Sequence, residues 1–271
     1  MVAILLFFAF LPPSGMEKTT IFFQEDPSIR YSITGNSGNV ILSAHLSEEA
    51  GSGLIQTDYQ KGNGFVAFDK NTQHVTADFK KKFSFNHLAK AIRKDAPKMK
   101  IFAPHESTVD LNLKLIDLGI GQFNFANLNV SHLDLDARFG EVYLDFPTEN
   151  KVIIRDQVHI HLMAGKLEIT DLANLKAEKW WINGGVGDLS LDIGEKLLKK
   201  TEIRLDLDIG ELTINIPKGT KVEIRGTSRK MDEYGFLSVG KEWIAAEYHQ
   251  SSPLLTIHLL GPLGSLNINW K

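Results

Sequence analysis

The chain has 271 residues, of which 43% are hydrophobic, and it carries 30 Lys+Arg, 33 Asp+Glu and no cysteine. This length and composition allow a sizeable core in one large or two ordinary domains. The net charge of −3 gives no cationic excess for nucleic acid, and the lack of cysteine excludes disulfides, thiolate catalysis and sulfur-ligated zinc.

The N-terminus holds an uninterrupted apolar run, Val2–Leu11, followed by two prolines. A run of about ten residues is too short to span a bilayer as a helix, which needs roughly 20 residues. It has the length of a signal-peptide hydrophobic region. We therefore predict that residues 1–15 form a leader and that the protein is extracytoplasmic: periplasmic, surface-exposed or secreted. The alternative is that this apolar run forms a buried first strand or helix. The only contact with a membrane that we expect is through the leader, if it is not cleaved.

Residues 16–110 are predicted to form a β-rich N-terminal region. Four segments alternate apolar and polar residues in the manner of strands: Ile29–Leu46, Gly53–Tyr59, Gly64–Phe68 and His74–Phe79. A short helix is expected from Ser84, ending before Pro97.

A glycine-centred repeat follows, and the stretch Arg204–Pro217, RLDLDIGELTINIP, shows it best. Apolar residues stand seven, five, three and one positions before Gly210 and two and four positions after it, which predicts a bend within one ribbon. The same pattern surrounds the glycines at 140 and 165, less complete copies surround those at 187 and 264, and a weaker copy surrounds Gly121. The repeat is just over twenty residues long. The residues directly before the glycine, which we expect to face inward, include Phe139, Ala164, Val186 and Ile209.

This periodicity predicts an all-β fold, a right-handed parallel β-helix-like solenoid over residues 111–271, because each unit can bury its apolar stripe only by stacking on its neighbours. The pattern lapses from Gly226 to Pro253, which we interpret as a decorated coil or terminal cap. A sandwich of antiparallel hairpins is the alternative.

The repeats, the segment APHESTVDLNLKLIDLGIGQFNFANLNVSHLDLDARFGEVYLDF and the closing segment EWIAAEYHQSSPLLTIHLLGPLGSLNINW resemble the bacterial toast-rack family. Its relatives include candidate adhesins and the C-terminal domains of cell-envelope stress-response regulators. The resemblance covers roughly residue 34 to the C-terminus. It implies a β-solenoid and carries no catalytic motif. The regulators have several membrane-spanning helices ahead of the domain, whereas here only a short leader precedes it.

Outward carboxylates recur in pairs, but a solvated strand face explains them better than acid–base chemistry does. The pairs are Asp134 and Asp136, Asp188 and Asp192, and Asp206 and Asp208. The chain has no Gly-rich phosphate loop followed by Lys-Ser or Lys-Thr and no Gly-x-Ser-x-Gly elbow. We therefore predict that it is not an enzyme and uses no cofactor.

The pair His159 and His161 points to one outward face of a strand. Stacked on the preceding coil, these imidazoles would lie beside Asp134 and Asp136, a ligand set suited to a metal ion. An ordinary Asp–His contact between strands is the alternative.

Trp181 and Tyr143 are predicted to face outward and are candidate binding-surface residues. The predicted function is a non-catalytic envelope or secreted solenoid that acts as a binding, adhesion or scaffold module. Its partner would be an envelope polymer or another envelope protein, with no nucleic acid. The alternatives are a cell-envelope stress-sensing domain and a polysaccharide-active enzyme.

Overall fold

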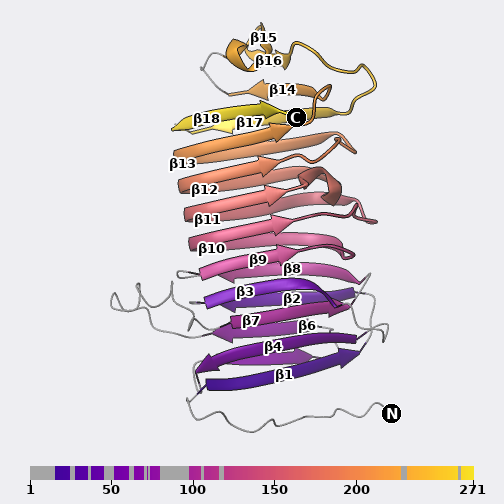
Figure 1. Ribbon diagram of the computed structural model, residues 1–271, viewed down its shortest axis with the longest axis vertical. Coiled ribbons are helices and arrows are strands. Elements are labelled where there is room, and N and C mark those ends of the chain that lie inside the picture. The colour runs from indigo at the N-terminus through magenta and orange to yellow at the C-terminus, as the bar shows by residue number, and fades with distance from the viewer. Residues whose placement is uncertain are drawn as a thin grey trace. The chain divides into compact units, whose positions relative to one another are not determined.

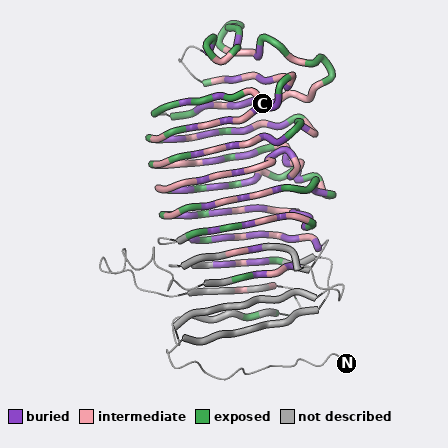
Figure 2. The backbone as a smooth tube through the Cα atoms, viewed as in Figure 1, coloured by how far each residue is buried: buried purple, intermediate pink, exposed green. Residues whose placement is uncertain are grey.

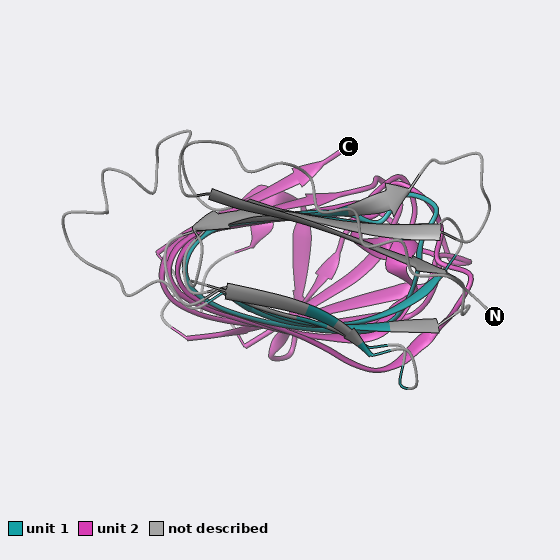
Figure 3. Ribbon diagram, turned by 90° about the horizontal axis from the view of Figure 1, so that it is seen from below, with its two compact units in different colours: residues 1–142 teal, residues 143–271 magenta. Residues whose placement is uncertain are grey.

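The computed structural model describes residues 16–24, 28–35, 38–45, 52–60, 64–69, 72, 74–79, 98–104, 107–115, 119–226, 231–261 and 264–271. The predicted leader and the helix expected from Ser84 lie outside these residues. The described chain is all-β apart from short 3-10 turns. None of its helices is long and apolar enough to cross a membrane. Two compact units are distinguished, residues 1–142 and 143–271 (Figure 3).

The first unit combines parallel and antiparallel strand pairs. Its strands are β1 Met16–Gln24, β2 Ser28–Gly35, β3 Gly38–His45, β4 Ser52–Gln60, β5 Gly64–Asp69, β6 His74–Phe79, β7 Lys98–Pro104, β8 Thr108–Leu115, β9 Gly119–Asn124 and the start of β10 Asn129–Asp145. β4 pairs antiparallel with β1 and β7, and β5 with β6. β2 pairs in parallel with β6 and β8, β3 with β7 and β9, and β8 with β10. The expected strands are confirmed, and the described part of the segment Ile29–Leu46 is divided between β2 and β3.

Parallel pairing dominates the second unit (Figure 1). Its elements are β11 Ile154–Thr170, β12 Ala177–Asp192, β13 Thr201–Ile216, β14 Lys221–Arg225, β15 Phe236–Val239, β16 Glu242–Ala245, β17 Leu254–Leu260, β18 Ser265–Trp270, and two 3-10 turns, Leu172–Leu175 and Asp232–Tyr234. β12 lies between β11 and β13, and β13 also pairs with β17 along its first half and with β18 along its second half. β17 also pairs in parallel with β14. These parallel pairs contradict the sandwich of antiparallel hairpins for this unit.

The repeat glycines are stacked in register. Gly165 aligns with Gly187, and Gly187 aligns with Gly210. Their φ angles are 139°, 144° and 152°, which side chains with a Cβ rarely adopt. Each glycine lies inside one continuous long strand, so the predicted bend within a single ribbon is confirmed.

Apolar residues alternate along the strands and build the core (Figure 2). In the second unit Trp180 aligns with Val158 and with Ile203, and all three are buried. The Trp180 ring meets Phe146 edge-on, with ring centroids 6.2 Å apart. Figure 3 shows strands of this unit on both sides of a common interior.

One part of the predicted burial pattern is wrong. Phe139, Val186 and Ile209, directly before the glycine, are exposed, and Ala164 is only half-buried. The chain leaves the interior earlier than expected: the last buried residue before Gly210 is Leu207, three positions ahead of it. The positive φ of the glycine turns the strand, and the residue before it lies on the outside of this corner.

The segment expected to form a cap does interrupt the parallel pattern. β15 and β16 pair antiparallel with each other, and β16 pairs antiparallel with β14. The Trp270 indole N–H donates to the carbonyl of Tyr234 at 2.7 Å, and the Tyr234 hydroxyl donates to the carbonyl of Leu266 at 2.5 Å. Two hydrogen bonds therefore join the cap to β18, the last strand.

Candidate binding surface

Five outward side chains form a row across the strands of the second unit. His159 aligns with Trp181, Trp181 with Arg204, Arg204 with His258, and His258 with Arg225, on β11, β12, β13, β17 and β14. Neighbouring strands lie about 4.8 Å apart, so the row spans roughly 20 Å. We call these five residues the outer ladder.

Trp181 offers the largest apolar surface of the outer ladder. Its side chain is 42% exposed, whereas that of Trp180 is 1% exposed, because neighbouring residues of a strand point to opposite faces. The His159 ring lies beside it, with ring centroids 5.5 Å apart and planes tilted by 48°. The prediction that Trp181 faces outward is confirmed.

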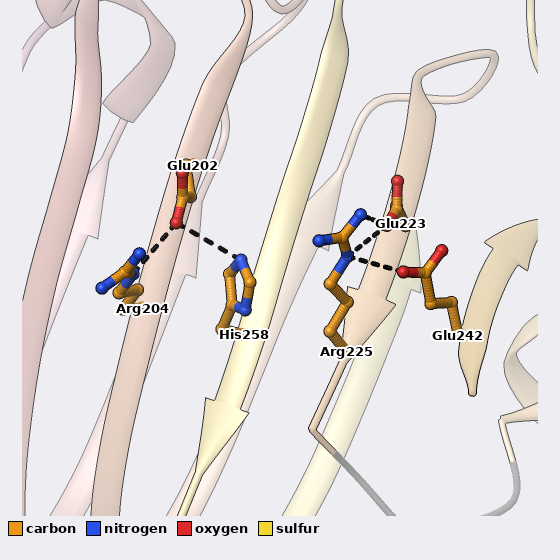
Figure 4. Close-up of polar contacts among 6 residues, drawn as sticks. All are labelled: Glu202, Arg204, Glu223, Arg225, Glu242 and His258. Atoms are coloured by element: carbon orange, nitrogen blue, oxygen red, sulfur yellow. Dashed lines mark hydrogen bonds and ion pairs between the residues drawn. The ribbon is translucent and has the colours of Figure 1, made fainter.

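A shared carboxylate holds the next two side chains (Figure 4). Nε of Arg204 donates to Oε1 of Glu202 at 2.9 Å, and Nε2 of His258 lies 3.3 Å from the same oxygen. The hydrogen bond from Arg204 is the main cause that lowers the pKa of Glu202. Burial is the main cause that lowers the pKa of His258, so its imidazole is mostly neutral at neutral pH.

Arg225 is held in a similar way at the end of the ladder. Its guanidinium contacts Glu223 on the same strand, and its Nε lies 3.1 Å from Oε1 of Glu242 on β16 (Figure 4). Two arginines therefore face three carboxylates in this region, which leaves a formal charge of −1 with His258 neutral. The ladder together with these three carboxylates is rich in hydrogen-bonding groups and carries no excess of positive charge.

The expected metal ligands are placed only in part. His159 and His161 are both exposed on β11, two residues apart and on one face, as predicted. Asp134 and Asp136 lie on β10 in the first unit, so their place beside the histidines stays a prediction. Among the described residues no group of three or more His, Asp or Glu side chains could hold a metal ion.

Tyr143 belongs to a different part of the surface from Trp181. It is half-buried, and Nζ of Lys166 lies 5.2 Å from its ring centroid. Lys166 comes just after the corner glycine of its strand, whereas Trp181 comes before that of β12. The two candidate binding residues are therefore not brought together by the contacts described.

Several outward polar residues after the corner glycines bond one another. Asn269 donates to Asn215 at 2.9 Å, Asn267 donates to Glu211 at 2.7 Å, and Lys271 contacts Asp192. Such contacts are typical of a solvated, mutually hydrogen-bonded strand face. Of the outward aspartates named from the sequence, Asp192 takes part in such a contact, as a solvated strand face predicts.

The sequence contains a signal for the outer ladder in the spacing of its residues from the repeat glycines. His159, Trp181, Arg204 and His258 each stand six residues before a repeat glycine. Aligning the repeats by their glycines therefore places these four side chains in one row. Arg225 carries no such signal, because no repeat glycine follows it at that spacing.

No family model and no curated protein matches the chain. It is similar to solved structures described as a "putative cell adhesion protein" from Clostridium sporogenes (13% identity, TM-score 0.42, covering 94% of this chain and 100% of that one) and a "putative adhesin" from Parabacteroides merdae (11%, 0.35, 96% and 95%). A further "putative adhesin", from Bacteroides fragilis, is 10% identical with a TM-score of 0.32, covering 93% of this chain and 97% of that one. At TM-scores below 0.5 these likenesses carry no argument about function, and the resemblance to the toast-rack family stays a prediction.

Proposed function

We propose that the protein is a non-catalytic binding or adhesion module of the cell envelope, built as a right-handed β-solenoid of the toast-rack kind and exported by its leader. In-register parallel pairing of β11, β12 and β13, with a corner glycine in each, supports the solenoid. Each repeat adds a rung, and side chains at equivalent positions form rows on the outside.

The observation that carries the binding function is the outer ladder with Trp181 exposed among polar side chains already held by their neighbours. The stability of the fold requires neither the exposed indole nor the fixed polar side chains around it. Recognition of a partner benefits from both, because fixed side chains lose little conformational entropy when a partner binds. The partner is an envelope polymer or an envelope protein.

The test is equilibrium binding of the purified protein to fractionated cell-envelope material. We expect saturable binding that Trp181→Ala weakens at least about tenfold, as for a central aromatic contact in an interface. Ile209→Ala is the matched control, because Ile209 is 64% exposed but lies at the corner, away from the ladder. No saturable binding, or equal loss in both variants, contradicts the proposal.

A further inference from the structure

We infer that the outer ladder binds an uncharged polysaccharide chain laid across the strands. The inference rests on the proposed binding function and adds the class of ligand. It follows from three features of the ladder: the exposed indole of Trp181, the hydrogen-bonding groups fixed beside it, and the balance of charge around them.

The indole supplies the apolar part of the site. One face of a sugar ring carries C–H groups that are apolar and slightly positive, and the face of an aromatic ring is slightly negative. A sugar ring can therefore stack on Trp181, which is 42% exposed. The tilted ring of His159, 5.5 Å away, forms the side of this platform.

The neighbouring strands supply the polar part. A sugar hydroxyl both donates and accepts hydrogen bonds, and Arg204 and Glu202 offer donors and acceptors as one bonded pair. His258 contacts the same carboxylate, and Arg225 is fixed by Glu223 and Glu242. These side chains are already oriented, so a hydroxyl-rich ligand meets a prearranged surface.

Charge decides between a neutral and an anionic polymer. A polyanion binds through excess Lys and Arg that displace its counterions. Here the two ladder arginines face three carboxylates. In the flanking rows Lys179 aligns with Glu202 and Asn183 with Asp206, so these rows add one cation and one further anion. Nucleic acids and other polyanions gain no electrostatic attraction from such a surface.

The length of the ladder favours a chain over a single sugar. Trp181 lies second and Arg225 fifth in the row, and the five rungs span roughly 20 Å. A monosaccharide on Trp181 would leave the contacts at His258 and Arg225 unused. A chain that runs across the strands engages all of them at once.

The test is affinity electrophoresis of the full chain in gels containing dextran, laminarin, mannan or soluble chitin oligosaccharides, with heparin as the polyanion. We expect at least one neutral glycan to retard the protein, and Trp181→Ala to abolish this while Ile209→Ala leaves it unchanged. Retardation should hardly change between about 50 and 500 mM salt, since no ion pairs form with the ligand.

Glu202→Gln gives an independent readout. It removes the carboxylate that orients Arg204 and His258, so we expect weaker binding of the neutral glycan by about threefold or more. A polyanion site would instead bind more tightly, because the change adds net positive charge. Circular dichroism melts check that the variants remain folded.

The outcomes separate this inference from the proposed function. The carbohydrate inference is overturned if envelope material binds in a Trp181-dependent way but no neutral glycan retards the protein. It is also overturned if heparin or a protein fraction accounts for the binding; in both cases the binding function stands. If neither experiment shows Trp181-dependent binding, the binding function and the carbohydrate inference are both overturned.

Discussion

Replacing Gly210 by alanine should lower the free energy of unfolding by about 3–5 kcal/mol. Two effects contribute. The φ angle of 152° strains any residue with a Cβ, at about 1–3 kcal/mol. The added Cβ would also lie 1.7 Å from the carbonyl oxygen of Gly187 on the neighbouring strand. Ordinary van der Waals contact begins at 3.4 Å, so relief needs a shift of at least about 1.7 Å. Such a shift would weaken nearby ladder hydrogen bonds, which are worth about 1 kcal/mol each.

Urea unfolding followed by circular dichroism measures this loss, and Gly240→Ala is the matched control. Gly240 also has a positive φ, 65°, but a Cβ there would meet nothing within 4 Å. Its replacement should cost only the backbone strain, about 1–2 kcal/mol. Equal losses at Gly210 and Gly240 would refute the argument that the stacked corner glycines leave no room for a Cβ.

The remaining predictions concern burial, pH and metal. Ile209→Ala should change the free energy of unfolding by less than about 0.5 kcal/mol, whereas Ile214→Ala, in the core, should cost about 2–5 kcal/mol; similar losses in urea melts would restore the inward placement of Ile209. The folded pKa of His258 lies below its unfolded value of about 6.5, so its contribution to stability should be full above that pH and fall as pH drops through the folded pKa. In His258→Gln the melting temperature should therefore depend less on pH between about pH 5 and 7, and an unchanged dependence contradicts this. If His159 and His161 bind Zn²⁺, calorimetry should show stoichiometric uptake at about pH 7.5 that is lost near pH 5 and absent from the doubly Gln-substituted variant; equal uptake by that variant rules these ligands out.

The glycine register could be predicted from the sequence because it depends on local features. A residue without Cβ, flanked by alternating apolar residues and repeated at a regular interval, indicates both the bend and the stacking. Gly165, Gly187 and Gly210 accordingly align in the structure. The outward position of Trp181 followed from the same alternation.

Other features depend on long-range contacts, and the pattern does not contain them. Alternation does not reveal where a corner begins, so Ile209 was expected inside although it is 64% exposed. Nor does it reveal which strands become neighbours: β17 separates β13 from β14 along the row, and this brings Arg225 beside His258. β4 pairs antiparallel with β1 and with β7, and short alternating runs do not specify this direction.

Because neighbouring residues of a strand point to opposite faces, the core and the outer surface of the second unit can vary independently. Inward residues such as Trp180, Ile203 and Ile214 are buried, and their loss would cost several kcal/mol each. Outward residues at the next positions, Trp181 and Arg204, contribute little to the core, so their identity is constrained weakly by folding. The fold therefore does not require an exposed tryptophan beside a braced arginine, and the binding function proposed above would account for this combination.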